Sequence, residues 1–90
     1  MTDQEKAELS QDIMQFLASL GRTGTTESIL IRHLRRNHWA SLGEQQIRDH
    51  LDYLVRRGFI ETKAGVLNPT SQRYHITPRG IEVLQEEGLA

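Results

Sequence analysis

The stretch IRDHLDYLVRRGFIE, residues 47–61, decides the fold of this chain. Its apolar side chains recur at the spacing of a helix that buries one side, namely Ile47, Leu51, Leu54 and Val55. Gly58 then supplies the left-handed conformation that commonly ends a helix, because glycine adopts it without steric strain. Phe59 to Lys63 has the composition of a short strand. The stretch therefore predicts a helix that turns almost at once into a strand.

The start of this helix is predicted from Ser41-Leu42-Gly43-Glu44, which matches the capping-box pattern. In that pattern Ser41 accepts a hydrogen bond from the Glu44 amide, while the Glu44 carboxylate reaches back to the Ser41 amide. The pattern predicts a third helix over residues 42–57.

Two helices are expected before it. The first covers residues 4–20, ends at Gly21 and buries Leu9, Ile13, Phe16, Leu17 and Leu20. The second covers residues 26–37, is capped by Thr25 or Thr26, and buries Ile29, Leu30, Ile31 and Leu34. Trp39 lies in the break after it, where it is expected to anchor the turn to the core; stacking on a nucleobase is the alternative.

A hairpin and a last helix are expected after residue 58. Strands over 59–63 and 72–77 enclose a loop at 64–71, with Gly65 and Asn68-Pro69 as turn residues. Thr77 as N-cap and Pro78 in the first turn predict a helix over 78–87, with Ile81 and Leu84 facing inward.

This order of elements resembles the winged helix-turn-helix domain of MarR-like and PadR-like bacterial regulators. The resemblance is sharpest in residues 47–61 and in YHITPRG, residues 74–80. It implies a mainly α fold with a small β-hairpin: a three-helix core, a two-stranded wing over 59–77 and a C-terminal helix, in one domain of residues 1–90. It also implies that 42–57 is a recognition helix and that the protein binds double-stranded DNA as a transcriptional regulator. Winged helices also serve as protein-binding modules, so a protein partner on the recognition-helix face is the alternative.

Composition excludes several other classes. The 90 residues include no cysteine, so no disulfide framework, thiolate metal site or cysteine nucleophile is available, and a reducing cytoplasm is the expected setting. Apolar runs reach only three residues, as in Ile29 to Ile31, against the roughly 20 needed to span a bilayer. The pattern offers no phosphate-binding glycine loop and no pocket for catalysis. A protein without enzymatic activity, cofactor or membrane contact is expected, and a chain this small suits a phage or mobile element as well as a chromosome.

Charge is distributed unevenly along the chain. Residues 22–79 hold ten basic side chains against five acidic ones, a balance of +5. Residues 1–21 and 80–90 each carry a balance of −3, which leaves the whole chain at −1. A polyanion could therefore bind the middle while the two acidic ends lie away from it. Chance clustering of solvated charges is the alternative.

The candidate DNA contacts come from the two central helices and the wing. They are Arg32, Arg35, Arg36, Ser41, Gln45, Gln46, Arg48, Asp49, Tyr53, Arg56, Lys63 and Arg73. The arginines of 26–37 suit phosphates, and the two glutamines suit adenine edges, since an amide can pair with N6 and N7. Ordinary solvated surface side chains are the alternative for each.

Two carboxylates complicate the recognition helix. Asp49 and Asp52 repel phosphates unless they hold Arg48, Arg56 or Arg57 in place or accept from cytosine N4. Asp52 and Arg56 stand four residues apart, which favours an ion pair and a structural role for Asp52.

The wing and the histidines complete the candidates. Lys63 and Arg73 at its base and Asn68, Thr70, Ser71 and Gln72 toward its tip suit phosphate or minor-groove contact, or form a solvated hairpin. His33, His38, His50 and His75 lack the spacing and the cysteines of a zinc site, so no metal is expected. A homodimer through the first and last helices is also expected, because one winged helix contacts few base pairs.

Overall fold

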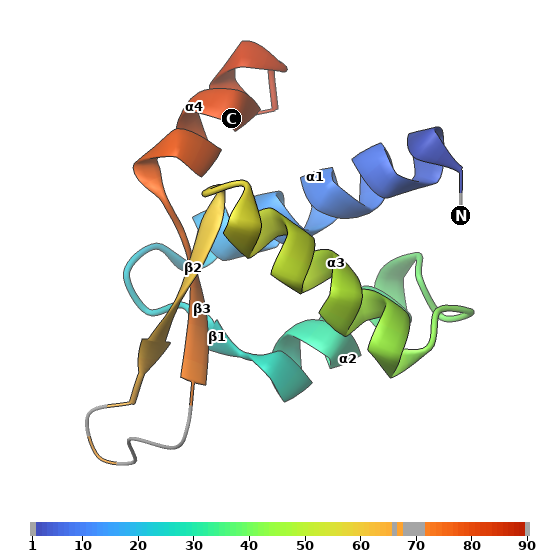
Figure 1. Ribbon diagram of the computed structural model, residues 1–90, viewed down its shortest axis with the longest axis horizontal. Helices are drawn as coiled ribbons and strands as arrows, with labels where there is room; N and C mark the ends of the chain where they lie inside the picture. Colours follow the sequence, from blue (N-terminus) through green and yellow to red (C-terminus); the bar gives the residue numbers. More distant parts are fainter. Residues whose placement is uncertain (1, 66, 68–71, 90) are drawn as a thin grey trace.

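Three helices pack around one apolar centre, and a small sheet and a fourth helix extend from it (Figure 1). The computed structural model describes residues 2–65, 67 and 72–89. The elements run in the order α1 (Asp3–Leu20), β1 (Thr25–Thr26), α2 (Glu27–Asn37), α3 (Glu44–Arg56), β2 (Ile60–Ala64), β3 (Gln72–Ile76) and α4 (Pro78–Glu86). This is the winged helix-turn-helix fold that the sequence predicts, with α2 and α3 as the helix pair and β2 and β3 as the wing.

The core comes from the predicted apolar stripes. Its fully enclosed members are Leu9, Ile13, Leu17, Leu30, Leu34, Ile47, Leu51, Leu54, Ile60 and Leu84. Trp39 is also buried, at 5% exposure, and its indole Nε1 donates to Asp12 Oδ2 over 2.7 Å. The prediction that Trp39 anchors the interhelical turn is therefore confirmed, because its ring joins the core while its polar edge is satisfied by α1.

The sheet has three strands rather than the two predicted. Strand β3 lies in the centre, with β1 pairing antiparallel to one edge and β2 to the other. Thr25 pairs with Tyr74, and Ile60 pairs with Ile76. Strand β1 is only two residues long, which is too short to show a period in sequence, and it exists because β3 offers it a free edge. The wing is therefore tied to the segment that leads into α2.

Helix α3 begins two residues later than predicted, and the predicted capping box is wrong. Gly43 is the N-cap residue, and its amide donates to Gln46 Oε1 over 3.0 Å. The Leu42 amide donates to the Trp39 carbonyl, so Ser41 lies in a turn ahead of the helix. Only the return bond of a capping box forms, from Gln46 to the Gly43 amide and two residues later than predicted, because the Trp39 turn sets where the helix starts.

Two apolar residues expected inside lie outside. Ile29 is 48% exposed and Ile81 is 39% exposed. The buried side of α2 includes Leu30 and Leu34, so Ile29 stands about 100° from Leu30 around the helix. In α4 the buried positions are Gly80 and Leu84, which turns Ile81 outward by the same geometry.

Helix α4 has the N-cap that its sequence predicts. Thr77 caps α4 as predicted, since its side chain accepts from the Gly80 amide over 3.0 Å. The predicted wing-tip residues Asn68, Thr70 and Ser71 lie outside the described residues. Among the described residues, the helices do not combine the length and apolarity that crossing a bilayer requires.

Gly80 allows α4 to pass close to the backbone that precedes β2. A Cβ at this position would stand 2.2 Å from the Phe59 carbonyl oxygen and 2.8 Å from Ile76 Cγ1. The carbonyl cannot yield, because Phe59 O already accepts from the Thr77 amide over 3.1 Å. The close approach places α4 against the wing base.

Replacing Gly80 with Ala should therefore lower the free energy of unfolding by about 2 to 4 kcal/mol, as expected for an overpacked rigid site. Urea denaturation monitored by circular dichroism measures this. Gly43→Ser is the matched control, because a Cβ at Gly43 meets nothing closer than 3.8 Å and serine is a good N-cap residue. An unchanged urea midpoint for the Gly80 variant would contradict the close packing of α4.

Candidate nucleic-acid interface

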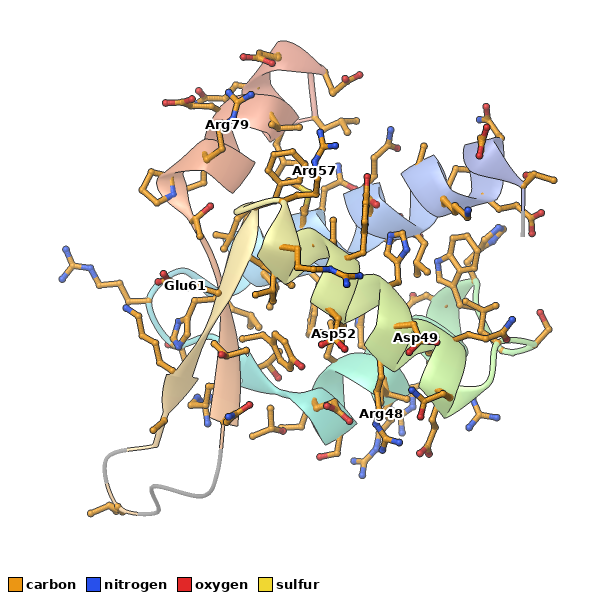
Figure 2. All side chains as sticks on the ribbon, viewed as in Figure 1. Arg48, Asp49, Asp52, Arg57, Glu61 and Arg79 are labelled. Atoms are coloured by element: carbon orange, nitrogen blue, oxygen red, sulfur yellow. The ribbon has the colours of Figure 1, made fainter. Side chains whose placement is uncertain are left out.

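The outward side of α3 follows from the side that it buries. Ile47, His50, Leu51 and Leu54 face the core. On the opposite side lie four exposed polar residues, Gln45, Asp49, Asp52 and Arg56. Figure 2 shows Asp49 and Asp52 on the same outward side of α3, with Arg48 turned toward α2. The prediction that α3 exposes a mixed polar face is confirmed.

The two glutamines of α3 have different partners. The Gln45 side-chain amide donates to Asp49 Oδ1 over 2.9 Å, which holds it along the exposed face of the helix. Gln46 uses its carbonyl oxygen to accept from the Gly43 amide and so closes the first turn of α3. Gln46 also lines a hollow beside α1 together with Tyr53, which is 42% exposed. Of the two, Gln45 lies nearer the centre of the outward face.

Arg48 links α3 to the start of α2. Its Nε donates to Glu27 Oε1 over 2.5 Å, and its Nη2 lies 3.4 Å from Glu44 Oε2. Glu27 begins α2, and its charge also acts on Tyr74 of β3. The bond to Glu27 raises the pKa of Arg48, while burial and then the Glu27 charge raise the pKa of Tyr74. Sequence reasoning identified Arg48 but missed Glu27 and Tyr74, since only the fold brings residues 27, 48 and 74 together.

A groove between α2 and α3, which we call the arginine groove, is lined by the three arginines of α2 and by Arg48 of α3. Its lining is Glu27, Ser28, Ile31, Arg32, Arg35, Arg36, Ala40, Glu44 and Arg48. The three α2 arginines are exposed, and among the described residues none has a carboxylate within 4.0 Å. Arg48 differs from them, because its two acidic neighbours already neutralise it. The α2 arginines are therefore available to pair with an external anion.

The two wing cations have partners within the protein. Arg73 donates from Nε to the Thr23 carbonyl over 3.0 Å and from Nη2 to the Gly24 carbonyl over 3.2 Å. Lys63 Nζ lies 3.4 Å from Glu61 Oε1. Figure 2 shows Glu61 on the side of β2 turned away from α3, and Lys63, two residues on, shares that face. Arg73 thus fastens the turn before β1, a task that its sequence position did not suggest.

The predicted Asp52–Arg56 ion pair does not form. Within the described part of the chain, the two groups do not come within 4.0 Å of each other. Arg57 is also engaged elsewhere, since its guanidinium lies 5.4 Å from the Phe59 ring centroid and 6.0 Å from that of Tyr53. The ion pair on which a structural role for Asp52 was predicted is therefore wrong.

His50 connects the recognition helix to α1. It is 8% exposed, and its Nε2 lies 2.7 Å from Ser10 Oγ. Burial and then the positive charge of Lys6 lower the pKa of His50. His33 is stacked on Phe16 with ring centroids 3.8 Å apart. The described residues contain no group of three histidine, aspartate or glutamate side chains placed to hold a metal ion.

The fold is shared with known regulators. A PadR-like transcriptional regulator from Bacillus cereus superposes with a TM-score of 0.74 at 25% identity, over 94% of this chain and 82% of that one. A ZitR mutant from Lactococcus lactis gives 0.70 at 14% identity over 90% and 49% of the two chains. An S. aureus MepR mutant bound to an oligodeoxyribonucleotide gives 0.72 at 14% identity over 86% and 51%. No protein-family model matches the sequence, and no curated protein matches it either.

These neighbours define the class of the chain. It is a winged helix-turn-helix domain that resembles MarR-like and PadR-like regulators, as its sequence predicts. The chain spans about half the length of the ZitR and MepR proteins that it matches. The PadR-like neighbour is a transcriptional regulator, which supports a DNA-binding regulator as the general class of the chain.

The depressed pKa of His50 makes stability depend on pH. Below about pH 6.5, the ordinary histidine pKa, the unfolded chain takes up a proton that buried His50 resists, so the free energy of unfolding should fall with falling pH. The loss should level off below the folded-state pKa. The charged groups around this imidazole are Lys6, Asp3 and Asp49.

Urea midpoints between about pH 7.5 and 5 measure the effect. His50→Gln should remove part of the pH dependence, and the same change at exposed His38 is the matched control for the loss of an imidazole. Equal pH dependence in the two variants would show that His50 titrates as it does in the unfolded chain.

Proposed function

We propose that this protein is a cytoplasmic transcriptional regulator that binds double-stranded DNA with α3 in the major groove. The observation that carries the proposal is the arginine groove, where three α2 cations without described carboxylate partners flank the exposed face of α3. Phosphate contacts from such side chains supply most of the affinity of DNA-binding domains and fix their register on the duplex. The DNA complex of the MepR neighbour supports this use of the fold.

In this arrangement the elements divide the work. Arg32, Arg35 and Arg36 contact phosphates beside the major groove, and the outward face of α3 meets the base edges. Gln45 reads a base from the first turn of α3, with Gln46, Tyr53 and Arg56 at the margins of the contact. Ser41 and Arg48 lie next to the backbone. Lys63 adds only long-range attraction, because it lies on the face of β2 turned away from α3 and pairs with Glu61. The bonds of Arg73 to Thr23 and Gly24 make its contribution indirect as well.

Replacing both Arg35 and Arg36 with Ala should weaken binding to every DNA sequence alike. The slope of log affinity against log salt should fall in magnitude by up to about two, because two phosphate contacts are lost. Fluorescence anisotropy with random duplexes over a salt series measures both quantities. Arg79→Ala is the control and should leave the salt slope unchanged, because Arg79 lies on α4 and pairs with Glu82 over 3.3 Å.

An unchanged slope would remove α2 from the interface. If the unaltered protein ignores DNA even at low salt, DNA binding itself is refuted, and a protein partner for α3 becomes the leading account.

We propose further that the protein is a homodimer through α1 and α4. These helices pack together, carry the acidic ends of the chain, and expose Ile81 on α4. A two-fold dimer would double a recognition site that is short for one winged helix. Light scattering at a few hundred micromolar should give twice the 10.3 kDa chain mass, and Ile81→Lys should return it to one. A monomer at that concentration contradicts the proposal.

A further inference from the structure

Asp49 and Asp52 are the unexplained feature of the α3 surface. Both are exposed, and both lie on the side of the helix opposite the buried stripe (Figure 2). They are three residues apart, which separates them by about 4.5 Å along the helix axis. Two negative charges are therefore displayed where a DNA-binding helix would be expected to carry neutral or positive groups.

Neither carboxylate is needed to neutralise a neighbouring arginine. Within the described part of the chain, Asp52 has no ion pair within 4.0 Å, and the contact to Asp49 is the single hydrogen bond from the Gln45 amide. Arg48 is held by Glu27 and Glu44 instead, and Arg57 lies over two aromatic rings. The two aspartates thus retain free acceptor oxygens directed to the outside.

The major groove offers these acceptors one well-matched donor. Cytosine presents its N4 amino group alone, whereas guanine presents two acceptors and thymine an acceptor and a methyl group. Adenine has a donor at N6, but the N7 acceptor beside it repels a carboxylate. A carboxylate on the outward face of α3 therefore favours cytosine and disfavours each of the other bases.

The distribution of charge between α2 and α3 fits this selectivity. Three arginines on α2, which have no carboxylate partner among the described residues, attract the phosphate backbone of any sequence. The carboxylates of α3 oppose entry into a groove that offers only acceptors, because an unpaired buried carboxylate loses its hydration without compensation. In this division, α2 supplies general affinity for DNA and α3 supplies discrimination between bases.

We propose that Asp49 and Asp52 are specificity-determining residues that accept hydrogen bonds from cytosine N4 in the major groove. This proposal rests on the proposed DNA-binding function. It predicts a preferred site with cytosine at one or two neighbouring positions, because the spacing of the two carboxylates is close to the roughly 3.4 Å rise per base.

The test begins with selection of preferred sites from random duplexes by the unaltered protein, Asp49→Asn and Asp52→Asn. Replacement of a carboxylate by an amide keeps the shape of the side chain but suits adenine N6 and N7 instead of cytosine N4. The unaltered protein should enrich cytosine at defined positions, and at least one variant should exchange it for adenine or lose the preference there. Substituting another base for that cytosine should weaken binding by the unaltered protein at least about fivefold.

Affinity for random duplexes distinguishes base recognition by the aspartates from a general effect of their negative charge. Both variants should bind random duplexes as well as or better than the unaltered protein, because each loses one negative charge. Glu87→Gln on the far end of the chain is the matched control for a lost charge and should leave the preferred site unchanged. Thermal unfolding of each variant confirms that it is folded, as expected for changes at exposed positions.

Two results would contradict the role proposed for Asp49 and Asp52 while leaving the proposed DNA-binding function intact. One is that both variants select the same site as the unaltered protein with the same preference over random DNA. The other is that the selected site contains no cytosine opposite α3. Failure of the unaltered protein to bind any duplex at low salt would instead refute the DNA-binding function itself.

Discussion

Burial of one side of α3 is the constraint on which the rest of the surface depends. Ile47 and Leu51 are 0% exposed and Leu54 is 1% exposed, so rotating α3 about its axis would expose them and cost several kcal/mol of hydrophobic free energy. His50 reinforces the same orientation through its bond to Ser10 on α1. With that side held inward, the helical repeat leaves no choice about the outward residues, Gln45, Asp49, Asp52 and Arg56.

Ion pairing then divides the arginines into two kinds. Arg48 is fixed by Glu27 and Glu44, so it acts mainly as a link between α3 and the start of α2. The α2 arginines lie in the same groove without such partners among the described residues, so an anion that enters the groove can pair with them. The net charge of −1 for the whole chain therefore says little about the local electrostatic potential, which depends on which arginines are paired with carboxylates.

The wing is held to the helix pair by backbone and side-chain bonds together. Strand β1 pairs with β3 immediately before α2 begins, and Arg73 donates to two carbonyls of the preceding turn. Glu27 brings Arg48 of α3 and Tyr74 of β3 into one electrostatic cluster. These contacts connect the wing to the helix pair at several points.

The sequence by itself determined the fold class, the apolar stripes, the Gly58 helix end and the Thr77 cap, because these depend on residues that are near one another along the chain. It also identified the basic middle and the exposed polar face of α3, since helical periodicity converts buried positions into exposed ones. Tertiary structure alone decided the third strand, the start of α3 at Glu44, and the partners of Arg48, Arg73 and Asp52. The third strand and the bonds of Arg48 to Glu27 and of Arg73 to Thr23 join residues 21 to 50 positions apart. The start of α3 and the unpaired state of Asp52 among the described residues depend instead on which of several local partners the packed chain brings together. Local sequence shows which side chains can pair, but only the packed chain shows which of the available partners each one reaches.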